Sequence, residues 1–593
     1  MSIVPLKKVT FVGMTGDKEK VLRSLQNLGC LEIIPLHDQG DHENLKPSTR
    51  AKDALRFLLD CPQKRRQIKD PSRFSAEKAK EVEGRAVDLQ KKLFDLNEER
   101  DFLYKRGAAL NAWGEFKLPS LDEMDGIRLW FYVVPHKDMP SVMNRPSTCW
   151  QLIRRDQRFC YIVIISKEEP TDMPVEREHL GNKNRQDIEQ HIEEIEFEIE
   201  DLQAERVYLT RWIYLFSRSL DLLEDGAARA HVAGQTLDQE PVFALQAWAP
   251  TQSVQELQDY CSKENIVFES TAPEPGDNPP TLMHNPEKFA AGEGLVTFYM
   301  TPGYQAWDPS ITVFCSFAIF FSMILSDAGY AVVMLLGLLF FWKKMESSKN
   351  VRRWRSLLAM LVTASIAYGI MVGSYFGLSP RAGTLLSRLN ILDLQDSNKM
   401  MMISVIIGVI HVCLGAVMDA IRHGRSSKAL PSYGWVLLIG GGFVLSIGAT
   451  GSIEELKILG GSLLVVGAIL IVLFSGLGQK PLNRIGTGLL ALAGITGAFG
   501  DILSYLRLFA LGVASASLAV AFNDMSAQIH QSMPGVGLFF AILVLILGHS
   551  LNLLLGISSG VIHGMRLNVI EFFNWALKEE GKIFQPFHRK ERF

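Results

Sequence analysis

The stretch Asp501-Ile502-Leu503-Ser504-Tyr505-Leu506-Arg507-Leu508-Phe509 lies within residues 485–524, which are otherwise almost free of charge. An arginine at that depth of an apolar segment costs at least a few kcal/mol to insert into a bilayer, so it usually marks a functional site. Apart from Asp501, long apolar runs flank Arg507, and its side chain is too short to reach an interface. We therefore interpret Arg507 as a functional charge; an arginine neutralised by a structural carboxylate is the alternative.

A second group of charges ends the last apolar segment, 536–567. His563 and Arg566 are three residues apart and share a helix face, and Glu571 follows His563 by close to two turns. Near a helix end such charges are equally typical of an interfacial anchor. Together with Arg507 they favour an ion path.

The chain of 593 residues divides into a charged first half and an apolar second half. Runs long enough to span a bilayer occur at 311–342, 356–378, 400–421, 432–450, 458–477, 485–524 and 536–567. The 7 cysteines lack CxxC spacing, which argues against a disulfide framework and a zinc site. A net charge of −3 says little about partners, and no cofactor, metal or nucleic acid is expected.

Charge predicts which side of the membrane each loop faces. Lysines and arginines gather in loops 343–355, 422–431 and 478–484 and in the tail 576–593, which we expect to be cytoplasmic. The N-terminus has no signal-peptide core, so residues 1–300 should be cytoplasmic too. These expectations agree only if 311–342 crosses twice, broken at Ser326-Asp327-Ala328-Gly329, with Asp327 hydrated near the outer surface. The alternative is a single tilted helix, with the break in another segment.

The first half predicts two α+β lobes joined by a long antiparallel coiled-coil arm. The expected parts are a proximal lobe (1–70 and 225–275, with a β-α-β start), arms (about 74–110 and 183–222, apolar at 3-4 spacing) and a distal lobe (about 115–180). The all-α membrane domain would occupy 301–575 with about eight helices, the last two long and tilted. No Walker-type loop occurs, so the chain alone should not hydrolyse nucleotide.

Several motifs resemble the membrane subunit of V/A-type rotary ATPases, called a in eukaryotes and I in bacteria and archaea. They are Ser326-Asp327-Ala328-Gly329-Tyr330, Ile410-His411 with Gly415, Ser504-Tyr505-Leu506-Arg507-Leu508 followed by Ala510-Leu511, His549-Ser550-Leu551-Asn552, His563 to Glu571, and Glu580-Gly581-Lys582-Ile583-Phe584-Gln585-Pro586-Phe587. The resemblance runs in register from about Pro279 to Phe587, and before that it is architectural only.

The resemblance implies a stator subunit with two ion half-channels against a proteolipid ring, coupling proton or sodium translocation to ATP hydrolysis or synthesis. Its partners would be the ring, peripheral stalk subunits, the soluble ATPase sector and membrane lipid, in the cell membrane. Arg507 and Arg566 would be the stator arginines, because a guanidinium stays charged and favours the charged form of a ring carboxylate. A stand-alone secondary transporter or channel with a cytoplasmic regulatory domain is the alternative.

Further residues are candidates for lining the path. His563 and Glu571 would serve the cytoplasmic half-channel and Asp327 the outer one; Asp501 would serve the outer one too, or form a local salt bridge. Further candidates are His411, His549, Asn552 and Ser504, although histidines in apolar runs more often hydrogen-bond between helices. The chain departs from the family pattern at Ala493, Ser515, Gly556 and Asn568.

Overall fold

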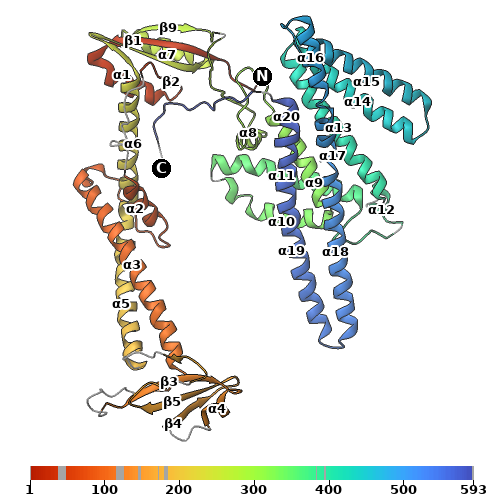
Figure 1. Cartoon of the computed structure of the whole chain (residues 1–593). Helices are drawn as coiled ribbons and strands as arrows, with labels where there is room; N and C mark the ends of the chain where they lie inside the picture. The colour runs from red at the N-terminus through yellow and green to blue at the C-terminus, as the bar shows by residue number, and fades with distance from the viewer. Residues whose placement is uncertain are drawn as a thin grey trace. The chain divides into compact units, whose positions relative to one another are not determined.

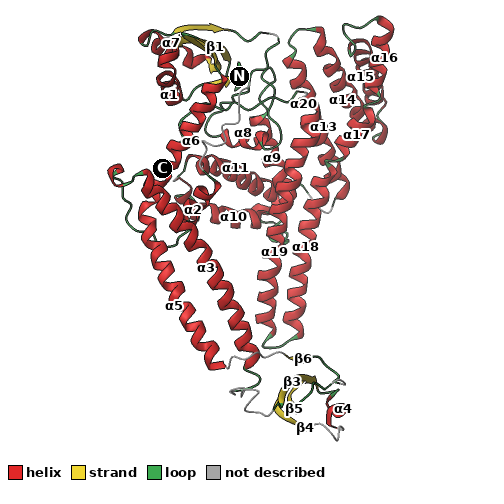
Figure 2. Ribbon diagram, turned by 60° about the vertical axis from the view of Figure 1, so that its left-hand side comes forward, coloured by secondary structure: helices red, strands yellow, loops and turns green. Residues whose placement is uncertain are grey.

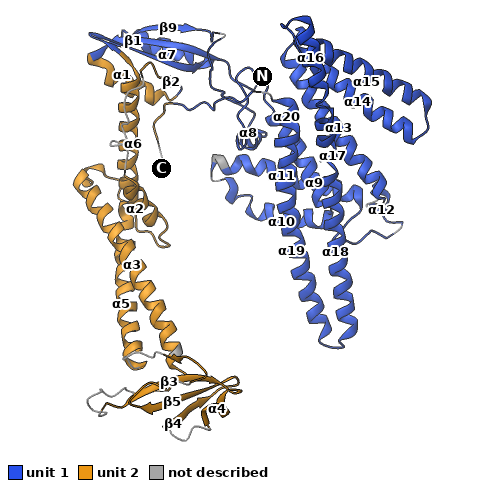
Figure 3. Ribbon diagram, viewed as in Figure 1, with its two compact units in different colours: residues 1–15, 30–34, 238–586 blue, residues 16–29, 35–237, 587–593 orange. Residues whose placement is uncertain are grey.

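The computed structural model describes residues 2–37, 48–114, 126–143, 149–170, 173–178, 185–274, 276–346, 348–381, 383–392, 396–577 and 579–590. They form two compact units, drawn in two colours in Figure 3. Unit 1 comprises residues 1–15, 30–34 and 238–586, and unit 2 comprises residues 16–29, 35–237 and 587–593. The boundary between the units differs from the predicted one near residue 300. Strands from residues 1–34 and from residues 237–271 pair in one sheet, and this sheet belongs to the same unit as the apolar half.

That sheet contains β1 (Leu6–Met14), β2 (Glu32–Ile34), β8 (Val242–Pro250) and β9 (Val267–Thr271) in the order β2-β8-β1-β9, with β7 (Leu237–Gln239) against β8. Each neighbouring pair on this path is antiparallel. The predicted β-α-β start is therefore present in split form, because β8 lies between β1 and β2. Alternate residues such as Val9, Phe11 and Leu245 are fully buried, as the two-residue period of a strand requires. Helix α7 (Val254–Lys263) connects β8 to β9.

Unit 2 is built on long helices. It contains α1 (Lys18–Leu28), α2 (Thr49–Leu59), α3 (Ala76–Leu110), α5 (Arg185–Leu209) and α6 (Ile213–Gln235). Helices α3 and α5 lie side by side (Figures 1 and 2) and share an apolar cluster that includes Leu93, Leu103, Ile192 and Ile195. A Cβ at Gly107, near the end of α3, would lie 3.7 Å from Ile188, near the start of α5, so the two helices run antiparallel.

A second sheet lies between α3 and α5 in the chain. It contains β3 (Arg128–Pro135), β4 (Cys149–Arg155), β5 (Phe159–Ser166) and β6 (Arg177–Glu178) in the antiparallel order β4-β5-β3-β6, with the short helix α4 (Met139–Met143). Tyr132, Val134, Ile162 and Ile164 form its buried face. These strands lie within the range predicted for the distal lobe, about 115–180.

The apolar half of unit 1 is helical. Its helices are α8 (Ala290–Thr297), α9 (Ser310–Leu325), α10 (Ala328–Phe341), α11 (Lys349–Val372), α12 (Leu385–Leu389), α13 (Ser397–Arg422), α14 (Leu430–Thr450), α15 (Glu454–Phe474), α16 (Pro481–Leu492), α17 (Ile495–Leu503), α18 (Leu506–Ser532), α19 (Gly537–Arg566) and α20 (Phe573–Ala576). Among the described residues, 6 helical segments are long and apolar enough to cross a membrane, while α9 and α10 are shorter apolar helices. Eight crossings stay a prediction.

The predicted break in 311–342 is confirmed between α9 and α10. Ser326 has a φ of 48°, and the Asp327 carboxylate caps α10 by accepting from the Tyr330 N–H at 3.0 Å. The predicted hydrated position of Asp327 is wrong, because its exposure is only 2%. It also accepts from the Ser374 hydroxyl at 2.7 Å and from the backbone N–H groups of Phe376 and Gly377 at 3.0 and 3.1 Å. The turn at 374–377 covers the tip of the hairpin.

Helix α19 packs closely on α9 through glycines. A Cβ at Gly560 would lie 2.6 Å from the Phe321 ring, and one at Gly564 would lie 3.3 Å from Phe317. Small residues at four-residue spacing allow such close helix approach in membranes. Helices α18 and α19 also run side by side (Figures 1 and 2), so α9, α18 and α19 hold the site residues in place.

Candidate functional site

Arg507 stands directly after a helix break. Helix α17 ends at Leu503 and α18 begins at Leu506, and the amides of Arg507 and Leu508 bond to carbonyls three residues back. The Ser504 hydroxyl donates to the Gly500 carbonyl at 3.1 Å and supports this turn. The Arg507 side chain is 22% exposed, so the break presents it at a partly open surface of the helices.

Arg566 stands before a π-helical segment at 567–572. Residues five apart share a face in a π-helix, which forms i→i+5 hydrogen bonds, but not in an α-helix. Arg566 Nε accordingly lies 3.9 Å from Glu571 Oε1, five residues later. The sequence predicted a regular α-helix from His563 to Glu571, whereas the π turn sets the position of Glu571.

Glu571 joins the two arginines. Its side chain is 3% exposed, and Oε1 lies 4.0 Å from Arg507 Nη1 as well as 3.9 Å from Arg566 Nε. His563 lies near enough to both guanidinium groups for an electrostatic interaction. The structure thus places Arg507 and Arg566 at Glu571, with His563 within electrostatic range of both arginines. Two fixed cations face one buried carboxylate, and the Arg566 side chain is 49% exposed.

His411 is a packed histidine. Its Nδ1 lies 2.8 Å from the Tyr505 hydroxyl, and its ring stacks on Phe572 at a centroid distance of 4.3 Å and an interplanar angle of 11°. Tyr505 is fully buried in the break before Arg507. His411 therefore anchors both the break and the π turn, which fits a role in hydrogen bonding between helices.

His549 and Asn552 belong to a polar network around Tyr330. The Tyr330 hydroxyl lies 2.7 Å from His549 Nδ1 and accepts from the Asn552 amide at 3.0 Å. His549 Nε2 lies 3.1 Å from Asn523 Oδ1, and the Asn552 amide also donates to the Ser515 carbonyl at 2.9 Å. The network links α10, α18 and α19 beyond Arg507 along α18.

Asp501 lies away from the arginines, at a cavity of about 310 Å³. Its carboxylate accepts from the Trp575 indole N–H at 2.8 Å and from the Asn574 amide at 3.4 Å. The lining residues also include Asp419, whose carboxylate accepts from the Ser432 hydroxyl at 2.6 Å. The cavity lies where α13 ends and α14 begins, beside the basic loop after Arg422.

The sequence interpretation missed Asp419, Ser432 and Tyr330. Asp419 lies three residues before Arg422 at the end of an apolar run, where charged residues are typical of a membrane interface. A carboxylate still within the apolar run 400–421 was the available signal. Tyr330 belonged to a quoted motif, but its partners lie more than two hundred residues later.

The geometry defines a polytopic membrane protein with buried and half-exposed charges facing one another between helices. The chain is 27% identical over 560 residues to a V-type ATP synthase subunit I of Chlamydia pneumoniae, covering 81% of each chain. It is 26% identical over 630 residues to the V-type ATP synthase subunit I of Borreliella burgdorferi, covering 100% of each. It is 27% identical over 448 residues to the A-type ATP synthase subunit I of Methanocaldococcus jannaschii, covering 68% of this chain and 64% of that one.

No protein-family model matches the chain. A solved structure of the cytoplasmic N-terminal domain of subunit I, a homologue of V-ATPase subunit a, aligns over 45% of this chain and 100% of its own, with 16% identity and a TM-score of 0.23. The similarity to these curated proteins, which extends over the whole chain for the Borreliella burgdorferi protein, confirms the resemblance to V/A-type ATPase subunit I that the motifs indicated.

Proposed function

We propose that this chain is the membrane stator subunit of a V/A-type rotary ATPase and that Arg507 and Arg566 face a ring of proteolipid carboxylates. The main support for this proposal is the surplus of positive charge around Glu571. Two guanidinium groups share one buried carboxylate. The Arg566 side chain is 49% exposed on the surface of a helix that is long and apolar enough to span a membrane. An arginine within the bilayer is costly, and a carboxylate supplied by another chain would offset this cost.

The distances favour exchange between partners. At 3.9 and 4.0 Å, the contacts of Glu571 to the arginines are longer than good charge-assisted hydrogen bonds, which are about 2.7–2.9 Å. One arginine can therefore turn from Glu571 to an arriving ring carboxylate while the other arginine stays beside Glu571, so that no charge is left isolated. A guanidinium does not deprotonate, so it separates the two half-channels without carrying a proton itself.

The cytoplasmic half-channel would begin at the cavity lined by Asp501 and Asp419 and continue to His563 and Glu571. The cavity adjoins the basic loop that follows Arg422, so we now assign Asp501 to the cytoplasmic path instead of the outer one. For the outer path, we propose the network of Tyr330, His549 and Asn552, because Tyr330 and Asn552 are as buried as Asp327 but His549, which bonds to Tyr330, is only partly buried and is titratable. We assign Asp327 the role of holding the hairpin closed.

In this proposal the chain crosses the cell membrane eight times, with the N-terminal half and the tail in the cytoplasm. The arm of α3 and α5 would bind peripheral stalk subunits, and through them the soluble ATPase sector. The transported ion is a proton or a sodium ion, which the ligands of the ring select. Because the sequence has no Walker-type loop, we propose that ATP hydrolysis takes place in other subunits.

The test is Arg507→Lys in the assembled complex, reconstituted in vesicles. A lysine keeps a positive charge but titrates and lacks the planar fork, so ATP-driven ion uptake should be lost while the complex still assembles. Arg422→Lys is the matched control: among the described residues, Arg422 forms a 2.5 Å contact with Glu579 and not with Glu571, so uptake should persist. Normal uptake by Arg507→Lys would overturn the assignment.

A further inference from the structure

Helix α6 of unit 2 carries two adjacent carboxylates that are both buried. Glu224 and Asp225 have exposures of 7% and 2%. Burial disfavours a charged carboxylate, and a like charge on the next residue adds to the cost. Such a pair is stable only where cations and hydrogen-bond donors meet both groups.

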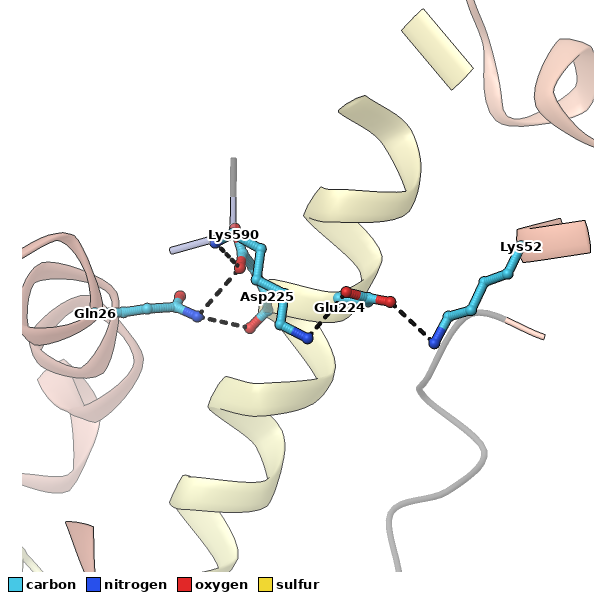
Figure 4. Close-up of polar contacts among 5 residues, drawn as sticks. All are labelled: Gln26, Lys52, Glu224, Asp225 and Lys590. Carbon is cyan, nitrogen blue, oxygen red and sulfur yellow. Dashed lines mark hydrogen bonds and ion pairs between the residues drawn. The ribbon is translucent and has the colours of Figure 1, made fainter. Parts of the chain in front are cut away.

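One side of this pair is met by residues from the same half of the chain. Lys52 Nζ of α2 lies 3.1 Å from Glu224 Oε1. The Gln26 amide of α1 points at Asp225, 3.4 Å from its carbonyl oxygen and 3.5 Å from Oδ1. Figure 4 shows these side chains converging on α6 from opposite sides. Arg229 holds the Gln26 carbonyl at 2.7 Å and so orients the amide toward Asp225.

The other side is met by the end of the chain. Lys590 Nζ donates to Glu224 Oε2 at 3.1 Å, and its backbone N–H donates to Asp225 Oδ1 at 3.0 Å (Figure 4). Arg589 Nε lies 3.6 Å from Asp225 Oδ2. Two consecutive basic residues, Arg589 and Lys590, therefore form ion pairs with two consecutive carboxylates. The hydrogen bond from the Lys590 backbone determines which basic side chain lies beside which carboxylate.

The two partners differ in burial. The carboxylate side chains are 6% and 3% exposed, whereas those of Arg589 and Lys590 are 50% and 57% exposed. Beside them lies a cavity of about 290 Å³, whose lining includes Tyr214, Arg218 and both tail residues. The acidic pair thus belongs to the body of unit 2, while the tail covers it from outside.

We propose that Glu224 and Asp225 form a binding site for a basic peptide and that its occupant is the C-terminal segment 588–590 of this same chain. The site fastens the end of the chain to α6 through two ion pairs and one backbone hydrogen bond. Because the cations are half exposed, the segment can be released and replaced without unfolding α6. This proposal is independent of ion transport and of the proposed function.

A cysteine pair measures occupancy of the site in the full-length protein. A Cβ at Gly29 would lie 3.0 Å from the Cβ of His588, somewhat less than the separation in a disulfide, about 3.5–4.5 Å, so the bond needs a small shift of the tail and a side chain at the left-handed φ of Gly29, +64°. With Cys30 replaced by serine, Gly29→Cys with His588→Cys should form a disulfide under mild oxidation. The bond closes a loop of most of the chain, which changes migration on a non-reducing gel.

Charge reversal tests what holds the segment. Arg589→Glu with Lys590→Glu should slow disulfide formation at least about tenfold, since hydrogen bonds to charged groups are the stronger ones. The matched control, Arg589→Lys with Lys590→Arg, keeps both charges and should cross-link at nearly the original rate. These residues are half exposed at the end of the chain, so their substitution leaves the folded core untouched.

A competing peptide tests the same site in a protein whose Arg589 and Lys590 are unchanged. Excess synthetic peptide copying residues 585–593 should slow the cross-link, and the same peptide with glutamates at 589 and 590 should not. Equal rates for the charge-reversed and charge-preserving proteins would overturn the proposal. Failure of the charge-preserving protein to cross-link would overturn it as well, because the segment would then not lie at α6.

Discussion

Two clusters of acidic and basic side chains in this molecule differ in the length of their contacts. In the helical part of unit 1, one buried carboxylate, Glu571, faces two arginines at 3.9 and 4.0 Å. In unit 2, Glu224 lies 3.1 Å from both Lys52 and Lys590, while Asp225 lies 3.6 Å from Arg589 and accepts from the Lys590 backbone N–H at 3.0 Å. Among these described residues, each cluster has one more cation than carboxylates. The contacts of Glu571 are all long, as expected of a site that exchanges partners, whereas Glu224 and Asp225 each have a contact close to 3 Å, as expected of a stable attachment.

The comparison predicts unequal costs for the same substitution. Glu571→Gln leaves Arg507, whose side chain is 22% exposed, and Arg566, 49% exposed, without their buried counter-charge. Because both are partly exposed, the change should cost about 2–3 kcal/mol of stability, less than in a fully buried pair, and it should abolish ion uptake. Glu224→Gln should cost less, because the lysines that it leaves behind are about half exposed and water solvates them. Thermal unfolding of the detergent-solubilised protein measures both. Equal shifts in midpoint would contradict the comparison.

A third buried carboxylate sharpens the comparison, because neutral donors surround it. The Asp327 carboxylate accepts four hydrogen bonds from α10 and the 374–377 turn. Asp327→Asn removes its charge and should lower the free energy of unfolding by about 2–3 kcal/mol. If Asp327 only holds the hairpin, the protein that remains folded should transport ions normally at low temperature. Loss of uptake in folded Asp327→Asn would return this carboxylate to the outer path.

Close helix packing is the next largest expected effect. Gly560→Ala places a methyl group 2.6 Å from the Phe321 ring, and such overpacking typically costs about 1–3 kcal/mol. Gly442→Ala on α14 is the matched control, because nothing lies within 4 Å of its added Cβ. The Gly560 variant should unfold at a lower temperature than the control. Equal melting temperatures would mean that α19 does not depend on this contact with α9.

The smallest expected effect is at Lys52. Lys52→Met removes one of the cations at Glu224, but the Lys52 side chain is 47% exposed, so the change should cost at most about 1 kcal/mol. The tail should compensate, because Lys590 still addresses the other oxygen of Glu224. Combined with Lys590→Met, the loss should exceed the sum of the single losses. Strict additivity would show that the two lysines act independently.

The sequence alone predicted the main charges of the membrane site. Arg507, Arg566 and Glu571 stand out because a charge in an apolar run is costly, and that cost can be judged from sequence. The helix break near Asp327 was likewise predicted from the length of 311–342 and from its Ser-Asp-Ala-Gly interruption. The strands and helices of the soluble half followed from two-residue and 3-4 periodicity.

Other features depend on residues far apart in the chain. The π turn at 567–572 changes the helical period locally, and a reading at 3.6 residues per turn cannot reveal it. Asp327 is buried because a turn some fifty residues later covers it. The docking of Lys590 on Glu224 joins residues 366 positions apart. No local pattern carries such information, so charges in a tail are interpreted as solvated.

The placement of β8 between β1 and β2 has a consequence for synthesis on the ribosome. When β1 emerges, the strand that will separate it from β2 has not been made, because β8 begins at Val242. At about 5–20 residues per second, the delay is roughly 10–50 s. During that time the apolar face of β1, including Val9 and Phe11, has no neighbouring strand from its own sheet. The nascent chain is therefore most open to misassembly or chaperone binding while its arm and distal sheet are being translated.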